Sequence, residues 1–83
     1  MIESKEQVLN QFLEKAQAFV ADPSLVNGID LDDASVTLKR YVLSVIHDEQ
    51  LGSSLARLHK LIRRLDVAAI SELAAEVEDK LAD

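Results

Sequence analysis

The chain has 83 residues, of which 48% are apolar, and carries 9 Lys and Arg against 15 Asp and Glu, a net charge of −6. This length predicts one domain, over residues 1–83, with a small core, and the apolar content argues against disorder. The acidic balance disfavours nucleic acid and anionic membranes as partners. Without cysteine and with only two histidines, disulfides, thiolate zinc sites and all-histidine zinc sites are excluded, so oligomerisation is the expected aid to stability.

Long apolar runs and targeting features are missing from the sequence. Uninterrupted apolar runs stop at about four residues, as at 67–70, whereas a membrane-spanning helix needs about 20. The opening residues, 1–6, are acidic and polar, which is not typical of a signal or transit peptide. We therefore expect a cytoplasmic protein with no membrane partner. Glycine and proline occur at three positions only, which favours an all-α fold, a compact antiparallel bundle of three or four helices.

The first predicted helix covers residues 5–21. Ser4 is a suitable N-cap, and Gln7 completes a capping box. Asp22 precedes Pro23 and so ends the helix, because a residue before proline avoids the helical region. Apolar residues follow the i, i+3, i+4 pattern and form one stripe, made of Val8, Leu9, Phe12, Leu13, Ala16, Phe19 and Val20.

A connector is predicted over residues 24–28, with Asn27-Gly28 as a turn. Its apolar neighbours are expected to lie against the core; they are Leu25, Val26, Ile29 and Leu31. Acidic residues suit the first turn of a helix, and Asp30, Asp32 and Asp33 therefore predict that a second helix starts there and covers residues 31–48. The main stripe of this helix consists of Ala34, Leu38, Tyr41, Val42, Val45 and Ile46.

The second predicted helix also has a narrower apolar patch on another side. Val36 and Leu43 are seven residues apart, and Arg40 and His47 lie beside them. A helix that is apolar on two sides is usually sandwiched between neighbours or used at an interface. We interpret this patch as the first candidate for a docking surface.

Gly52 is predicted to separate the second helix from a third, which starts after Ser53 or Ser54 as its N-cap. Asp66 is expected to cap a fourth helix over residues 67–82. One continuous helix over residues 54–82 is the alternative, because the apolar stripe can be followed through the break. The inward positions of the third helix are Leu55, Leu58, Leu61, Ile62 and Leu65.

A basic stripe occupies the other side of the third helix, formed by Arg57, Lys60, Arg63 and Arg64 in a segment that contains no acid from residue 55 to 65. Such a stripe is compatible with phosphate contacts by the second helix of a helix-turn-helix. The residues between offer no aromatic, Asn or Gln to read base edges, and nearby acids outnumber the bases. We interpret the stripe as a solvated or partner-contacting face, and a DNA-binding regulator using residues 55–65 is the alternative.

The stretch from Ile46 to Leu55 resembles the phosphoacceptor box of histidine-kinase dimerisation helices, with His47-Asp48, then Leu51-Gly52 and a further Leu. One extra residue separates His-Asp from Leu-Gly, which would rotate the histidine by about 100° on a continuous helix. His59 is a second histidine on a predicted helix. A histidine phosphotransfer protein is therefore a further alternative.

No nucleophile paired with a base, Gly-rich phosphate cradle or metal cluster is recognisable, so we expect neither an enzyme nor a cofactor. The sequence favours a non-enzymatic protein–protein interaction module that docks on another chain or on its own copy as a homodimer. The candidate interface combines the second patch with a charged rim, and consists of Val36, Arg40, Leu43, His47, Arg57, Lys60 and Arg64.

Overall fold

The computed structural model describes residues 4–82, so the first three residues of the acidic opening stretch lie outside it. The described chain forms four α-helices: α1 (Lys5–Ala21), α2 (Leu25–Tyr41), α3 (Glu49–Arg63) and α4 (Val67–Leu81). A π-helical turn, η1 (Val42–Ile46), continues α2 without a break. This confirms the all-α class, with four helices packed together.

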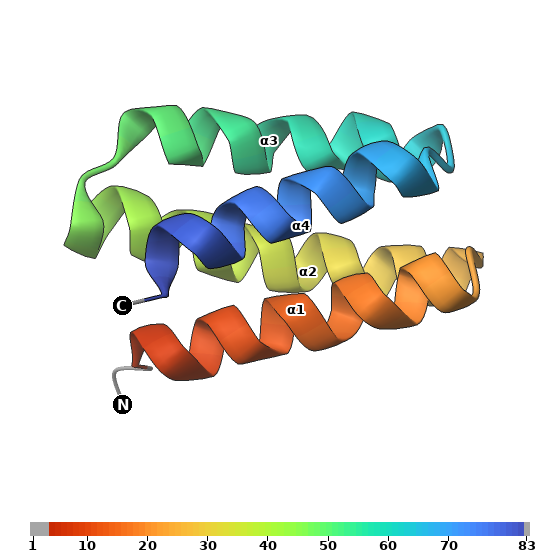
Figure 1. The fold of residues 1–83 in the computed structure, drawn as a ribbon, viewed down its shortest axis with the longest axis horizontal. Helices are drawn as coiled ribbons and strands as arrows, with labels where there is room; N and C mark the ends of the chain where they lie inside the picture. The colour runs from red at the N-terminus through yellow and green to blue at the C-terminus, as the bar shows by residue number, and fades with distance from the viewer. Residues whose placement is uncertain (1–3, 83) are drawn as a thin grey trace.

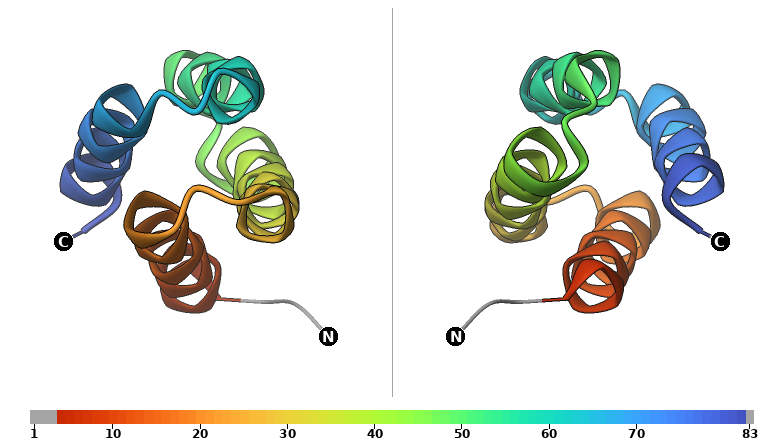
Figure 2. Two further views of the ribbon diagram at one scale, coloured as in Figure 1. Left: turned by 90° about the vertical axis from the view of Figure 1, so that its right-hand side faces the viewer. Right: turned by 90° about the vertical axis from the view of Figure 1, so that its left-hand side faces the viewer.

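The helices alternate in direction and form a ring when the bundle is viewed along its axis (Figures 1 and 2). Each helix packs against its neighbours in the chain, and α4 closes the ring by packing against α1. The radius of gyration is 11.7 Å, which equals the value of about 12 Å expected for a compact folded chain of this length. Diagonal pairs of helices do not pack directly among the described residues, so the side chains between them fill the centre.

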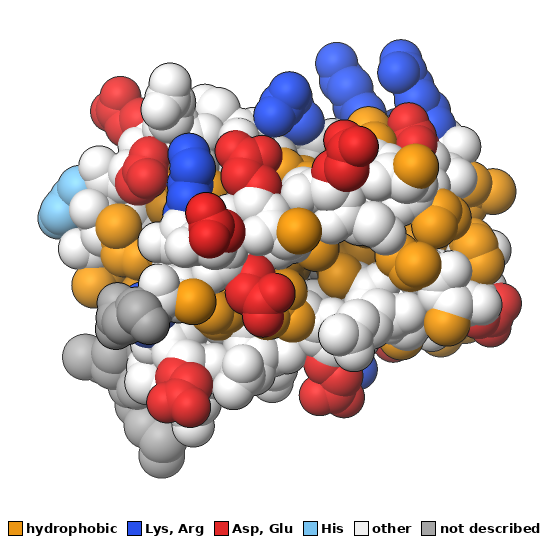
Figure 3. All heavy atoms as spheres, in the orientation of Figure 1, with side chains coloured by type: hydrophobic (Ala, Val, Ile, Leu, Met, Phe, Trp, Pro, Cys, Tyr) orange, Lys and Arg blue, Asp and Glu red, His pale blue; other side chains and the backbone are white. Residues whose placement is uncertain are grey.

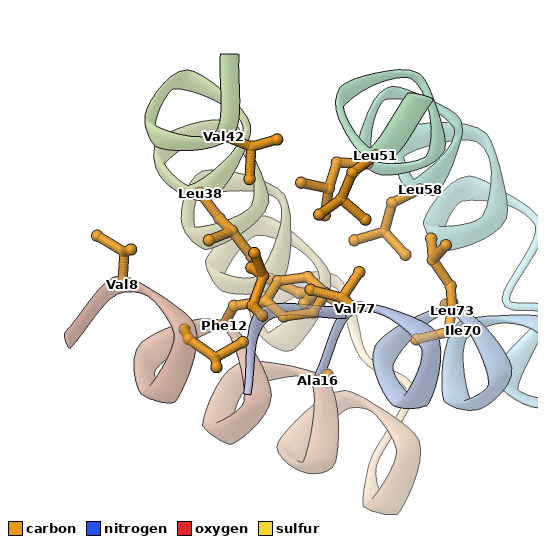
Figure 4. Close-up of a cluster of buried hydrophobic side chains, with 14 of the residues drawn as sticks. Val8, Phe12, Ala16, Leu38, Val42, Leu51, Leu58, Ile70, Leu73 and Val77 are labelled. Atoms are coloured by element: carbon orange, nitrogen blue, oxygen red, sulfur yellow. The ribbon is translucent and has the colours of Figure 1, made fainter. Parts of the chain in front are cut away.

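The core is built from the predicted stripe of α1 and from apolar side chains of the other three helices. Phe12 and Phe19 are fully buried, and the side chains of all four helices converge on one centre (Figure 4). A fully buried side chain of this size stabilises the fold by about 1.5–3 kcal/mol. The buried apolar residues are Val8, Leu9, Phe12, Ala16, Phe19, Leu31, Leu38, Val42, Leu51, Leu55, Leu58, Ile70, Leu73, Val77 and Leu81.

Every α-helix begins with the same device, a side-chain oxygen that accepts a hydrogen bond from the backbone N–H three residues later. Ser4 forms the predicted capping box with Gln7, and Asp66 caps α4 as predicted. The sequence analysis missed the other two N-caps, Ser24 for α2 and Asp48 for α3. Each cap satisfies one of the backbone donors that a helix start leaves unpaired.

The predicted connector over residues 24–28 is wrong, because α2 begins at Leu25. Asn27-Gly28 is no turn: the Asn27 side chain donates hydrogen bonds to carbonyls at the end of α1, and Gly28 is buried inside α2. A Cβ at Gly28 would lie 3.0 Å from Ile62 Cγ2 and 3.3 Å from a Phe19 ring carbon. Gly28 therefore permits close helix packing. The three aspartates that were expected in the first turn of the second helix lie further along α2.

The region between α2 and α3 also differs from the predicted one. The helix predicted to reach Asp48 ends in η1, and His47 takes a left-handed backbone with φ 62°. The third helix starts at Glu49, so Gly52 lies inside it and neither Ser53 nor Ser54 caps it. A π-turn is wider than an α-turn and so changes the direction of its side chains. Val45, which lies in η1 and was predicted to face inward, is therefore 54% exposed.

The break between α3 and α4 lies where Asp66 predicts it, and the single helix over residues 54–82 is wrong. Leu65 adopts a left-handed backbone with φ 56°, and Asp66 then caps α4. Leu65 was predicted to point inward, but its place in the turn leaves it 56% exposed. The turn folds α4 back, which brings it beside α1 (Figure 1).

Removal of the α4 cap tests the role of Asp66. The Asp66 Oδ1 atom accepts a hydrogen bond from the Ala69 N–H at 3.1 Å. We expect Asp66→Ala to lower the free energy of unfolding by about 1 kcal/mol, and Asp66→Asn, which keeps an acceptor, to cost less than half as much. Urea denaturation followed by circular dichroism measures both; equal losses would contradict the assigned cap.

The contact between Leu43 and Gly52 is open to a double-mutant cycle. A Cβ at position 52 would lie 2.6 Å from Leu43 Cδ2, so the leucine must move. Ala is favoured over Gly inside a helix by about 1 kcal/mol. We expect Gly52→Ala alone to change the free energy of unfolding by less than about 0.5 kcal/mol, but to stabilise a Leu43→Ala background by about 1 kcal/mol. Urea denaturation of the four proteins is the measurement, and an equal effect in both backgrounds would refute the contact.

Candidate functional site

The large apolar side chains that remain exposed are concentrated on one part of the bundle. All of them lie on α2, on η1 or in the α3–α4 turn, and the described parts of α1 and α4 contribute none. In the view of Figure 3, apolar atoms gather at the end where the α1–α2 and α3–α4 connections lie. The exposed residues are Leu25, Val26, Ile29, Val36, Leu43, Val45 and Leu65.

A hollow of about 410 Å³ lies between the first turns of α2 and the last turns of α3. The apolar side chains of Leu25 and Ile29 line it on α2, Ile62 lines it on α3, and Leu65 lines it from the turn. Its wall also includes Phe19 of α1, which the close approach at Gly28 brings within reach. The hollow is therefore an apolar depression that opens to solvent at one end of the bundle.

A second hollow, of about 200 Å³, continues the same groove along α2 and α3. Val36 lines it from α2, and Leu55 and Ala56 line it from α3. Asp32 and His59 border both hollows, and Asp32 Oδ1 lies 3.3 Å from His59 Nδ1 across the groove. Both side chains are partly exposed, so this pair contributes at most about 1 kcal/mol and marks the middle of the groove rather than holding the helices together.

We define the α2–α3 groove as these two hollows together. Its α2 wall includes Leu25, Ile29, Asp32 and Val36, whose spacing of four, three and four residues places them on one side of the helix. Three of the four are apolar and exposed. Leu43, seven residues after Val36, continues the series into η1, where it covers Gly52.

The charged side chains around the groove are of both signs on α2. Asp32 and Lys39 line the hollows from α2, whereas the other two aspartates of this helix line a separate depression beside α1. On α3, Arg63 lines the larger hollow, and Lys60 is exposed one turn earlier. The groove thus has an apolar centre bordered by charges of both signs.

The structure brings together only some of the residues that the sequence analysis selected. Val36 lies in the groove, and Leu43 is 42% exposed at its continuation. Arg40 and His47 are exposed, but neither lines the groove. Arg57 faces the other way, into a depression that it shares with residues of α4.

The sequence analysis missed Leu25, Ile29 and Leu65, which form most of the larger hollow. The first two were assigned to a connector and expected to pack on the core, and Leu65 was expected to face inward. A signal was available: Ile29 lies seven residues before Val36, and so extends the Val36–Leu43 series. This extension can be recognised only when α2 is known to begin at Leu25, because Ile29 then lies on the same helix as Val36.

The other candidate chemistries find little support in the geometry. Arg57 and Arg63 lie on opposite sides of α3, so the basic residues do not form one stripe. His47 ends η1 outside any α-helix, and His59 faces Asp32. Within residues 4–82, no group of three or more His, Asp or Glu side chains is placed to hold a metal ion.

No family model matches the chain, and neither a curated protein nor a solved structure matches it significantly. None of the helices described here has the length and apolar character needed to cross a membrane. We therefore infer the function of the chain from the geometry of the α2–α3 groove.

Substitutions of Leu65 test whether its side chain serves the groove or the stability of the fold. A left-handed backbone costs a residue with a Cβ roughly 1–2 kcal/mol, and glycine avoids that cost but loses more chain entropy on folding. We expect Leu65→Gly to raise the free energy of unfolding by about 0.5–1 kcal/mol. Leu65→Ala removes the same side chain but keeps the strain, so it should not stabilise. Thermal denaturation compares the two variants. An equal change in the free energy of unfolding for both would show that Leu65 is kept for packing.

Proposed function

We propose that the protein is a non-enzymatic interaction module that docks a helical segment of a polypeptide in the α2–α3 groove. The observation that carries the proposal is the row of exposed apolar side chains that lines the groove, with Leu25 81% and Ile29 53% exposed. Apolar surface gains about 25 cal/mol for each Å² removed from water. A contiguous patch of this kind on a small protein is typical of a docking surface.

The dimensions of the groove favour a helix as its occupant. From Leu25 to Val36 the α2 wall is about 16 Å long, the length of three helical turns. An amphipathic helix places anchors at i, i+3, i+4 and i+7, which suits two hollows in a line. The Asp32–His59 pair between the hollows supplies a polar contact in the middle.

The groove is less suited to catalysis or to a small polar ligand. Ser35 is the one buried polar side chain among the described residues, and its hydroxyl donates to the Asp32 carbonyl at 2.8 Å. No buried side-chain polar atom in residues 4–82 lacks a partner, so none is held ready for a substrate. The apolar lining of the groove is instead suited to binding a partner by burial of apolar surface.

Site-specific photo-cross-linking in the native host tests the proposal. A benzophenone amino acid at the exposed Leu25 position should give a discrete cross-linked product with one polypeptide, either another protein or the chain itself. The matched control places the same probe at Glu72, an exposed position of α4 outside the groove. Leu65→Gly should reduce the product several-fold without destabilising the fold. No product at position 25, or the same product from both positions, would refute the groove as a docking site.

A further inference from the structure

We infer that the occupant of the α2–α3 groove is an acidic amphipathic helix of another protein, which places one carboxylate at each end of the groove. This inference rests on the proposed function and names the chemistry of its partner. It follows from two bases that line the groove, Lys39 and Arg63, and that have no acidic partner within the described part of the chain.

Four titratable or charged side chains line the two hollows. Asp32 borders both, and its Oδ1 atom lies 3.3 Å from His59 Nδ1, so the one acid of the lining already faces a partner inside the groove. Lys39 lines the smaller hollow and Arg63 the larger one. Neither forms an ion pair or a side-chain hydrogen bond in residues 4–82. The charges left for a docked segment are therefore both positive.

Other acids close to the groove in sequence do not cancel this positive charge. Asp30 and Asp33 line a separate depression on the α1 side of α2. Asp22 lines neither hollow, and the carboxylates of Asp48 and Asp66 accept backbone hydrogen bonds at the starts of α3 and α4. The net charge of −6 thus coexists with a local excess of positive charge along the groove.

The two bases lie at opposite ends of the groove. The helices α2 and α3 run in opposite directions, and Asp32 faces His59. Arg63, four residues after His59, therefore lies near the level of residue 28 of α2. Lys39 is 11 residues further along α2, a separation of about 16 Å along the helix axis. Eleven residues make about three helical turns, so two acids that far apart on a partner helix share one face and can reach both bases.

Apolar anchors fit between those two acids. Positions i+4 and i+7 of the partner helix lie on the same face as acids at i and i+11, and they would meet the exposed side chains of Ile29 and Val36. The Asp32–His59 pair in the middle needs no further charge. Burial of the anchors supplies most of the binding free energy, and the two acids select the partner.

A basic helix or a second copy of this chain fits the lining less well. Lys39 and Arg63 would repel a basic helix, and like charges placed opposite each other disfavour a wrong partner. A second copy docked about a twofold axis would bring the bases of both copies into one interface. The one acid that lines the groove, Asp32, already faces His59 and is not free to meet them.

The experiment extends the photo-cross-link at position 25 in the native host. Mass spectrometry of the product identifies the cross-linked segment, which we expect to be an amphipathic helix with two acids about 11 residues apart. A synthetic peptide of that segment is then titrated with the purified chain by fluorescence anisotropy. We expect lysine in place of both acids to weaken binding at least about 10-fold, because both positions then repel a base of the groove.

Charge reversal in the chain tests the two bases directly. With Lys39→Glu and Arg63→Glu together, the acidic peptide should bind at least about 10-fold more weakly, and the lysine peptide should bind more tightly than it binds the unaltered chain. With Lys39→Arg and Arg63→Lys, both charges are kept. This variant should bind the acidic peptide within about threefold of the unaltered chain.

The matched control reverses two bases that lie outside the groove. Lys15 and Arg57 line depressions on other sides of the bundle, so Lys15→Glu with Arg57→Glu changes the net charge by the same amount. Distant surface charges are largely screened at physiological ionic strength, and binding should stay within about twofold of the unaltered chain. Circular dichroism establishes that every variant is folded.

Three results would overturn the acidic partner and leave the docking function standing. They are a cross-linked segment with bases or no charge at the two positions, a product formed with the chain itself, and an equal loss of binding from both double reversals. The absence of any product at position 25 would instead remove both the docking function and its partner.

Discussion

The close approach of three helices at Gly28 sets the geometry on which the rest of this protein depends. Because residue 28 has no side chain, Phe19 of α1 and Ile62 of α3 can both approach α2 at that point. The contact holds the first turns of α2 in the bundle. It also fixes the rotation of α2, which buries Leu31 and leaves Leu25 and Ile29 on the surface.

The groove follows from that rotation. With Leu31 and Leu38 directed into the core, the side of α2 that faces α3 carries a row of apolar residues together with Asp32 and Lys39. The turn that ends α3 adds Leu65 to the same surface through a left-handed backbone that a leucine adopts at a cost. A strained, exposed apolar residue beside an apolar hollow is better accounted for by docking than by folding, because folding alone would favour glycine there.

The sequence predicts those parts of the fold that depend on local signals. The stripe of α1, the capping box at Ser4 and the break at Asp66 could be predicted directly, because each is decided within a short stretch of chain. The errors in where α2 and α3 begin both involve glycine. Gly28 and Gly52 were taken as punctuation between helices, yet both lie inside helices, where they permit close packing against side chains distant in sequence or on the preceding turn. That use of glycine leaves no local signal that distinguishes it from a turn.

By itself, then, the sequence determined an all-helical chain with an apolar core, an acidic net charge, and a second apolar side on the second helix, because periodicity and composition are local properties. Only the tertiary structure decided where that second side begins and what it faces. The Ser24 cap marks the start of α2 locally, but the packing of Gly28 against Phe19 and Ile62 inside this helix is contained in no local pattern. The α2–α3 groove likewise arises only from the packing of these two helices, which brings Asp32 beside His59, 27 positions further along the chain.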